Sequence, residues 1–287
     1  MAERQGVLCL VHAHPDDESI ATGGVILRAK ENGHRVVLVT CTGGEEGEIH
    51  NLDAIPGGPG LDEIRAAELR RACAILGVDR LELLGYRDSG MAGAPGNRHP
   101  DSFLRAPLGA AAARVASLLR EERPEVVVTY SADGTYGHPD HVKAHSVTAA
   151  ALETLRRDGW QPAKAYWHAV PRTWARRVRD RLGSRAHDAM REVGVPDREI
   201  TTEVDVRHLL DRKRAAVAAH VSQIPHDPLS AMVGQVMVAM GGFEHFVRGG
   251  GYLRVERREK DLFAGIDLVN ARDLTPASTP EPARRRL

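Results

Sequence analysis

The sequence has few aromatic residues and no net charge. Aromatic side chains make up 4% of the 287 residues, and 39 basic residues balance 39 acidic ones. Proteins that bind nucleic acids or anionic membrane surfaces usually carry an excess of basic residues. Scarce aromatics also leave little surface on which bases can stack. We therefore expect a small-molecule partner rather than a nucleic acid or a membrane.

Cysteines and long apolar runs are also scarce. The three cysteines, Cys9, Cys41 and Cys73, lack the spacing of a disulfide framework, and each lies in an apolar pattern. This predicts buried free thiols in a reducing compartment. No apolar run reaches the roughly 18 residues of a membrane helix, and the N-terminal MAERQG is too short and polar for a signal peptide. These features favour a cytoplasmic protein.

Short apolar runs alternate with helical patterns over the first 170 residues. The pattern predicts strands at 7–11, 35–40, 81–85, 125–130 and 163–170, and helices at 18–32, 61–76, 106–122 and 139–157. Alternating short strands and helices are typical of a parallel sheet covered on both sides. The predicted fold is therefore α/β: a Rossmann-like, mostly parallel sheet with helices on both faces, plus a smaller irregular C-terminal region.

The chain after residue 170 is less regular. It predicts a helix at 172–191, a strand at 201–206, a helix at 207–221 and an apolar stretch at 228–240. The end is rich in proline and arginine, as in disordered tails. We expect three parts: a metal-dependent core over 1–170, an α+β region over 171–273 that completes the substrate cleft, and a disordered tail over 274–287.

Polar clusters follow four of the predicted strands. HAHPDDE ends the first strand, GGEEGE follows the second, YRDSG the third and SADGTYGHPDH the fourth. In a parallel sheet these strand ends meet at one rim, where ligands bind. The first cluster lacks the G-x-G-x-x-G of a dinucleotide site, and its acids would repel phosphate. The position therefore fits a ligand site, and the residue types favour a cation.

Two of these clusters share the sequence His-Pro-Asp. Imidazole nitrogen and carboxylate oxygen suit zinc and related divalent ions. A catalytic zinc has three protein ligands and an open position for water, and His14, Asp17 and His141 can supply these three. A single His-Pro-Asp turn is often only a satisfied loop, but two of them at strand ends are hard to attribute to chance.

The remaining polar residues then fit roles in amide hydrolysis. A bound metal lowers the pKa of water from about 16 to about 7, and Asp16 can accept the proton as general base. His138 can stabilise charge or protonate the leaving amine. Tyr136 can donate to an oxyanion, and Asp140 can orient a histidine. His141 and His145 also form H-x-x-x-H, but the HE dipeptide of metalloproteases is absent.

The paired motifs resemble the PIG-L/LmbE family of zinc-dependent N-deacetylases. HAHPDDE, TCTGGEEGE, IRAAEL, RDSGM, ASLLREERPEVVVTY and GTYGHPDH all match this pattern, and AHVSQ and DLFAGI match more loosely beyond residue 170. The resemblance implies an N-acetylglucosamine-type substrate and the roles assigned above. It further implies that Glu48, Arg65 and Asp88 bind substrate hydroxyls, although ordinary surface pairing would also explain these three residues.

Within the family, the resemblance is greatest to the mycothiol branch, which contains a GlcNAc-inositol deacetylase and a mycothiol S-conjugate amidase. Ile20-Ala21-Thr22 lacks a lysine that the amidases tend to carry, which favours the deacetylase, whereas NLDAIPGGPGLDE resembles the amidases. A deacetylase of antibiotic assembly would show the same core.

Other points stay open at the level of sequence. A non-catalytic carbohydrate-binding module could keep a structural metal, although structural zinc usually has four ligands that include cysteine. Zinc, iron or another divalent ion fits the ligands. A homo-oligomer is compatible with the sequence.

Overall fold

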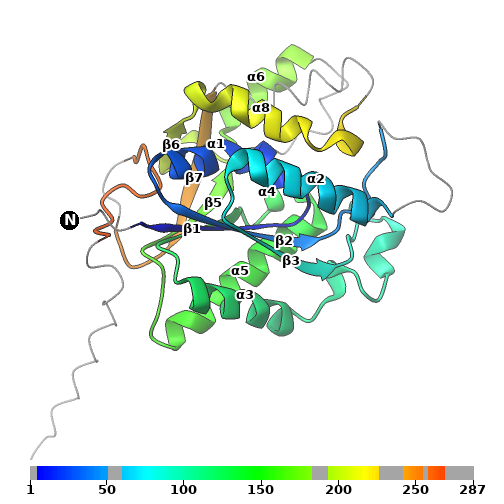
Figure 1. The fold of residues 1–287 in the computed structure, drawn as a ribbon, viewed down its shortest axis with the longest axis horizontal. Coiled ribbons are helices and arrows are strands. Elements are labelled where there is room, and N and C mark those ends of the chain that lie inside the picture. The colour runs from blue at the N-terminus through cyan, green and yellow to red at the C-terminus, as the bar shows by residue number, and fades with distance from the viewer. Residues whose placement is uncertain (1–4, 51–59, 183–192, 226–241, 255–257, 269–287) are drawn as a thin grey trace, which may run out of the picture.

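The computed structural model describes residues 5–50, 60–182, 193–225, 242–254 and 258–268 (Figure 1). Its centre is one seven-stranded sheet in the order β3-β2-β1-β4-β5-β7-β6. The strands are β1 (Val7–His12), β2 (Arg35–Thr42), β3 (Arg80–Tyr86), β4 (Val126–Tyr130), β5 (Lys164–Ala169), β6 (Thr202–Asp205) and β7 (Phe243–Gly250). The first five strands are parallel, and β7 is antiparallel to β5 and β6. The predicted Rossmann-like, mostly parallel sheet is confirmed.

Helices cover both faces of this sheet, as predicted. In Figure 1, α1, α2 and α8 lie on one face and α3 and α5 on the other. The helices are α1 (Asp17–Glu31), α2 (Leu61–Leu76), α3 (Leu108–Glu122), α4 (Gly134–Gly137), α5 (Pro139–Arg157), α6 (Arg172–Leu182) and α8 (Leu210–Ala218). Single 3-10 turns form η1 (Pro95–Arg98), η2 (Phe103–Arg105), η3 (Asp197–Glu199), η4 (Arg207–Leu209) and η5 (Val221–Gln223).

The strand β1 shows why the sequence reads as a continuous apolar run. Val7, Cys9 and Val11 pack into the core beneath α3 and α5, whereas Leu8 and Leu10 pack into the core beneath α1 and α2. Both faces of the strand are therefore buried, so that no polar residue alternates with the apolar ones.

The order of the strands reverses between β1 and β4. The chain passes from β1 outward to β2 and β3, then returns to place β4 on the other side of β1. Leu8 pairs with Val126 across this junction. Ligands in such sheets bind beyond the carboxyl ends of the strands at the point of reversal. The segments that follow β1 and β4, which contain the two His-Pro-Asp sequences, meet at this point.

The C-terminal strands extend the same sheet. The predicted strand 201–206 appears as β6, and the predicted helix 172–191 begins as α6. The predicted helix 207–221 is divided into η4, α8 and η5. The apolar stretch 228–240 and the predicted tail 274–287 lie outside the described residues. The division into parts at residues 170 and 273 stays a prediction.

The three cysteines are buried free thiols, as predicted. None of the helices in the described part of the chain combines the length and the apolar character that a membrane span requires.

Candidate metal centre

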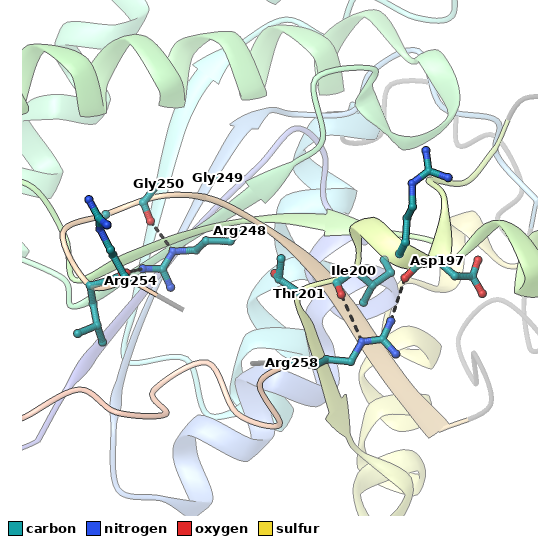
Figure 2. A pocket seen from close by; sticks show the side chains of 11 residues that line it. Asp197, Ile200, Thr201, Arg248, Gly249, Gly250, Arg254 and Arg258 are labelled. Carbon is teal, nitrogen blue, oxygen red and sulfur yellow. Dashed lines mark hydrogen bonds between the residues drawn. The ribbon is translucent and has the colours of Figure 1, made fainter. Parts of the chain in front are cut away.

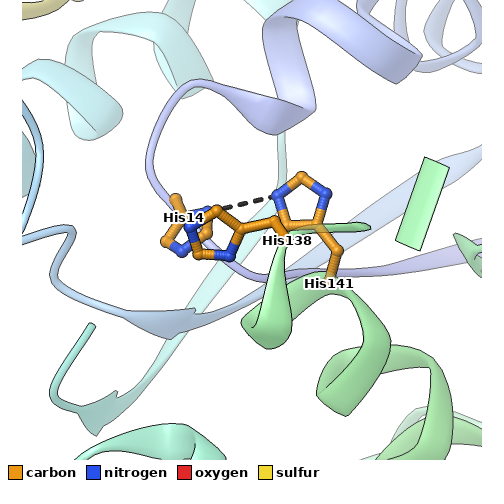
Figure 3. Close-up of side chains that lie close together, drawn as sticks. All are labelled: His14, His138 and His141. Carbon is orange, nitrogen blue, oxygen red and sulfur yellow. Dashed lines mark hydrogen bonds between the residues drawn. The ribbon is translucent and has the colours of Figure 1, made fainter. Parts of the chain in front are cut away.

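The two His-Pro-Asp segments come together at the reversal point of the sheet. His14 follows β1, and His138 and His141 lie at the start of α5. Figure 3 shows the three imidazoles side by side, and each offers a nitrogen within 4.8 Å of the others. His14, Asp88 and Asp140 form a second such group.

Three residues of the cluster place atoms at the spacing of ligands around one ion. His14 Nδ1 and His141 Nε2 are 3.3 Å apart. Asp17 Oδ2 lies 3.4 Å from His14 Nδ1, and Asp17 Oδ1 lies 3.4 Å from His141 Nε2. Zinc bonds of about 2.0–2.2 Å give a tetrahedron with edges of about 3.3–3.6 Å. The residues therefore fit a divalent cation.

In His14 and His141, the ring nitrogen that points away from Asp17 already has a hydrogen-bonding partner. His141 Nδ1 is 3.2 Å from the carbonyl oxygen of Gly134, and because a carbonyl can only accept, Nδ1 carries the proton. His14 Nε2 faces carboxylate oxygens of Asp140 at 3.4 Å and of Asp88 at 3.5 Å. These contacts leave lone pairs on His14 Nδ1 and His141 Nε2, the two nitrogens that face Asp17. Such outer partners commonly orient metal-ligating histidines.

Carboxylates make this position favourable for positive charge. Burial alone would lower the pKa of His14, but hydrogen bonds with Asp140, Asp17 and Asp88 raise that pKa well above its usual value. Burial opposes ionisation of Asp17, yet His141 and His14 hold the pKa of this carboxyl well below its usual value. A site that stabilises a proton on imidazole in this way also suits a metal cation.

Asp16 lies beside the proposed ligands in an unusual backbone conformation. Its φ of 117° is outside the regions that residues with a side chain normally adopt. The Asp16 amide donates to Glu18 at 3.0 Å, and the Arg65 guanidinium donates to the Asp16 carboxylate at 3.1 Å. Burial raises the pKa of Asp16 to about 6, although Arg65 acts to lower it. Such backbone strain is found at functional sites, and a base with a pKa near neutrality suits proton transfer.

His138 and Asp140 are held at the start of α5. His138 caps this helix, and its Nδ1 accepts from the Asp140 amide at 3.2 Å. Burial and the neighbouring His14 and His141 lower the pKa of His138 to about 4, so that the imidazole stays neutral. The Asp140 side chain is fully buried and contacts His14 Nε2, which agrees with an orienting role.

Tyr136 lies on α4 with its side chain half-exposed. Its ring is edge-on to that of His141, with centroids 4.9 Å apart. The preceding residue, Thr135, has a φ of 71°. Tyr136 is therefore close to the imidazoles on the side that faces solvent.

The three residues expected to bind substrate have different surroundings. Asp88 is buried beside His14, and its Oδ1 accepts from the Gly90 amide at 2.8 Å. Arg65 is buried and donates to Asp16 and to the carbonyl of Gly44. Glu48 has a side chain that is 84% exposed and lies 3.5 Å from His50. Asp88 and Arg65 thus adjoin the cluster, and a substrate role for all three stays a prediction.

Sequence reasoning missed two residues of the cluster. The Tyr130 hydroxyl accepts from the Ala13 amide at 2.7 Å and donates to Asp17 at 2.6 Å. Ser89 donates to both oxygens of Asp140, from its amide at 2.8 Å and from its hydroxyl at 2.5 Å. Both follow the rule that polar residues at strand ends meet at the rim, because Tyr130 ends β4 and Ser89 follows β3.

One cavity among the described residues does not include this cluster. Its volume is about 820 Å³, and Figure 2 shows it lined by arginines and glycines of the β6–β7 region. Arg248 donates to the carbonyls of Gly250 and Ala163, and Arg258 donates to those of Ile200 and Asp197. These arginines hold the chain around β6 and β7 together. A cavity of about 190 Å³ adjoins the cluster at Pro15.

Comparison with known proteins adds to this geometry. A family model described as GlcNAc-PI de-N-acetylase, PIG-L, matches residues 9–152. A protein of Acidothermus cellulolyticus named 1D-myo-inositol 2-acetamido-2-deoxy-alpha-D-glucopyranoside deacetylase is 44% identical over 94% of this chain and 99% of its own.

Solved structures are similar at lower identity. An N,N'-diacetylchitobiose deacetylase from Pyrococcus horikoshii has a TM-score of 0.59 at 21% identity, over 86% of this chain and 84% of its own. The 4-carboxy-2-hydroxymuconate hydratase GalB from Pseudomonas putida KT2440 has a TM-score of 0.57 at 19% identity, over 87% of this chain and 98% of its own. Because deacetylase and hydratase share this architecture, the fold by itself does not determine the reaction.

Proposed function

Because this chain belongs to the family of GlcNAc-PI de-N-acetylases, PIG-L, we propose that it is a metal-dependent hydrolase of N-acetylglucosamine-type substrates. The observation that carries the proposal is the mutual spacing of 3.3–3.4 Å among ligand atoms of His14, Asp17 and His141. Zinc is the proposed metal, with Fe²⁺ as the alternative, because histidine and aspartate ligands suit both.

The residues around the cation divide the work of amide hydrolysis. A divalent cation held by His14, Asp17 and His141 would supply Lewis acidity, which would polarise the amide carbonyl and lower the pKa of water. Asp16 takes the proton of the attacking water, and Arg65 holds the Asp16 carboxylate in place. His138 lies next to the ligands. Its neutral imidazole, with Nδ1 held by the Asp140 amide, donates from Nε2 to the developing negative charge, and Asp16 passes the proton that it accepted to the leaving amine. Tyr136 donates to the oxyanion from the solvent side, and Asp140 keeps His14 oriented.

For the substrate, we propose N-acetylglucosamine joined to inositol. The relative from Acidothermus cellulolyticus bears a name that specifies this substrate, and the similarity extends over almost all of both chains. Glu48, Arg65 and Asp88 are the proposed partners of the sugar hydroxyls, and region 171–273 is proposed to complete the cleft. We place the protein in a reducing cytosol, which agrees with its three free, buried thiols.

An amine-release assay tests the proposal. Purified protein is incubated with GlcNAc-inositol, free N-acetylglucosamine or a mycothiol S-conjugate, and fluorescamine reports the new amine. We expect the highest kcat/KM on GlcNAc-inositol, loss of activity with a chelator, and recovery on addition of Zn²⁺ or Fe²⁺. A preference for the S-conjugate would instead identify the amidase.

The same assay separates an enzyme from a binding module. Turnover that survives complete removal of the metal would contradict metal dependence. Saturable binding of GlcNAc-inositol without any acetate or amine release would replace the hydrolase with a carbohydrate-binding protein.

A further inference from the structure

A short turn after α8 contacts Glu18, which holds the backbone of the proposed base Asp16, and the loop that carries Glu48. This turn, called the HVSQ turn here, comprises residues His220–Gln223 and includes η5. It lies beyond the segment that the family model matches. In Figure 1, α8 lies beside α1 and α2 on one face of the sheet, which brings its C-terminal end to the rim.

The first contact leads from His220 to Asp16. His220 is 1% exposed, and its Nε2 lies 2.8 Å from one oxygen of Glu18, which is fully buried. The other oxygen of Glu18 accepts from the Asp16 amide at 3.0 Å. Because Asp16 has a φ of 117°, this hydrogen bond holds a backbone conformation that would otherwise relax. His220 therefore supports the orientation of Asp16 through Glu18.

The second contact fixes the turn to α2. Glu68 is 1% exposed, and its two oxygens accept from the amide and the hydroxyl of Ser222, each at 2.7 Å. Arg65, three residues earlier on the same helix, donates to the carboxylate of Asp16. The HVSQ turn thus holds the backbone of Asp16 through Glu18, and α2 holds its side chain through Arg65. The hydrogen bonds between Glu68 and Ser222 join these two elements.

The third contact leads from Gln223 to the loop that carries Glu48. Gln223 Nε2 donates to the carbonyl oxygen of Glu48 at 3.1 Å, and the His50 amide donates to the carbonyl oxygen of Ser222 at 2.9 Å. Gly47 is packed so closely that a Cβ atom there would lie 2.8 Å from Gln223 Oε1. The turn therefore sets the path of residues 47–50.

We propose that the HVSQ turn is a positioning element with two separable effects. Through Glu18, His220 orients Asp16 and so controls turnover. Through the backbone of residues 47–50, Gln223 places Glu48 and so controls substrate affinity. This inference rests on the proposed deacetylase function, and it assigns a role to residues that do not touch the cation.

Paired variants at the two ends of the turn test this inference. Steady-state kinetics on GlcNAc-inositol would compare His220→Ala and Gln223→Ala with wild type, below the unfolding transition of each protein. Because a catalytic group misplaced by about 1 Å can lose about 100-fold in rate, we expect His220→Ala to lower kcat at least about tenfold while KM stays within about twofold. Loss of the hydrogen bond to the Glu48 carbonyl, worth about 1 kcal/mol, should raise KM about fivefold in Gln223→Ala, with kcat unchanged.

Two further variants keep the test informative if His220→Ala is unstable. His220→Gln places an amide donor near the position of Nε2 and should restore most of kcat. His208→Ala removes an exposed histidine that pairs with Glu31 and should leave both constants unchanged. Metal content, measured by elemental analysis, should equal that of wild type in every variant.

Each outcome bears on the inference in a distinct way. An active wild type with the same kcat in His220→Ala overturns it, as does a metal content that falls in step with kcat. Equal changes of kcat and KM in both variants would show a merely structural turn. If wild type turns over none of the three substrates, the proposed function fails, and this inference fails with it.

Discussion

Asp16 is the residue on which the proposed chemistry depends most directly. Its carboxylate is held by Arg65, and its pKa is raised to about 6 by burial. Asp16→Asn keeps the size of the side chain and removes the base. We expect kcat to fall by about 10²–10⁴-fold, the usual contribution of general acid–base catalysis, with metal content unchanged.

Asp17→Asn provides the matched comparison, because the neighbouring carboxylate is a proposed ligand. This variant should lose metal as well as activity, and an excess of Zn²⁺ should restore part of the activity. If Asp16→Asn loses metal and Asp17→Asn retains it, the two roles are reversed.

Tyr130 gives a second prediction at this scale. Its hydroxyl joins the Ala13 amide to the Asp17 carboxylate, so Tyr130→Phe leaves both without that partner. Removing the hydrogen-bond partner of a metal ligand typically weakens metal binding by about 10–100-fold, which competition with a chromogenic chelator would measure. The unsatisfied buried amide should also lower the free energy of unfolding by about 1–3 kcal/mol.

Tyr86→Phe serves as the control for Tyr130→Phe. Tyr86 also ends a strand, but its ring packs against Phe103. The control should bind metal as tightly as wild type. Equal affinity in Tyr130→Phe and wild type would contradict a supporting role for Tyr130.

At the scale of elements, burial on both faces made the parallel strands predictable. The strand predicted at 7–11 follows from its apolar residues alone, and the rule that strand ends meet at one rim predicts that His14 and His141 lie together. Ser89 and Tyr130 were not found, because their roles depend on which oxygen of Asp140 or Asp17 they reach. Such contacts are set by packing and leave no periodic signal.

The helix predicted over 207–221 shows a second limit. Its alanines continue a helical pattern, but the Ser222 amide donates to Glu68 on α2. This contact comes from a residue 154 positions away, so local propensity could not reveal it. Tertiary hydrogen bonding overrides helix propensity here. The helix α8 ends at Ala218, and the residues after it form the HVSQ turn.

A buried ion pair connects α1 to β7 and α8. Lys213 Nζ donates to Glu244 at 2.6 Å, and Glu244 also accepts from the amides of Gly24 and Val25 in the middle of α1. A Cβ at Gly24 would lie 2.7 Å from the Glu244 carboxylate, so this approach requires glycine. Breaking a buried pair leaves an uncompensated charge, and Lys213→Met should destabilise the protein by about 3–5 kcal/mol.

Urea unfolding measures this effect. The double variant Lys213→Met with Glu244→Gln removes the unpaired charge and should recover part of the loss. If Lys213→Met unfolds at the same urea concentration as wild type, the pair does not stabilise α1 on the sheet.

At the scale of the whole molecule, the C-terminal strands are joined to the core rather than set apart. β7 pairs with β5 in the main sheet, and Glu244 on β7 reaches the helix that begins with Asp17. The proposed ligands, the proposed base and the C-terminal region therefore share one framework. A loss of packing at β5 or β7 is expected to affect the stability of the entire fold.

His168 on β5 makes that stability depend on pH. The side chain is 4% exposed, and neither ring nitrogen has a hydrogen-bond partner among the described residues. Burial, together with the neighbouring His12, Lys213 and His245, lowers the pKa of His168 to about 3. In the unfolded chain the pKa of histidine is about 6.5. Between these two values the unfolded state binds the proton and the folded state does not, so stability falls as the pH drops through this window.

The size of the effect follows from the same two pKa values. Between pH 7 and pH 5 the folded state should lose about 2 kcal/mol to this one group. The methionine in His168→Met cannot bind a proton. The free energy of unfolding of this variant should therefore fall about 2 kcal/mol less than that of wild type between pH 7 and pH 5. Urea titrations at pH 7, 6 and 5 would measure the difference, and His99→Met, at an exposed position, should behave like wild type. If His168→Met and wild type lose the same stability on acidification, His168 is protonated in the folded protein, and the sheet tolerates a charge at its centre.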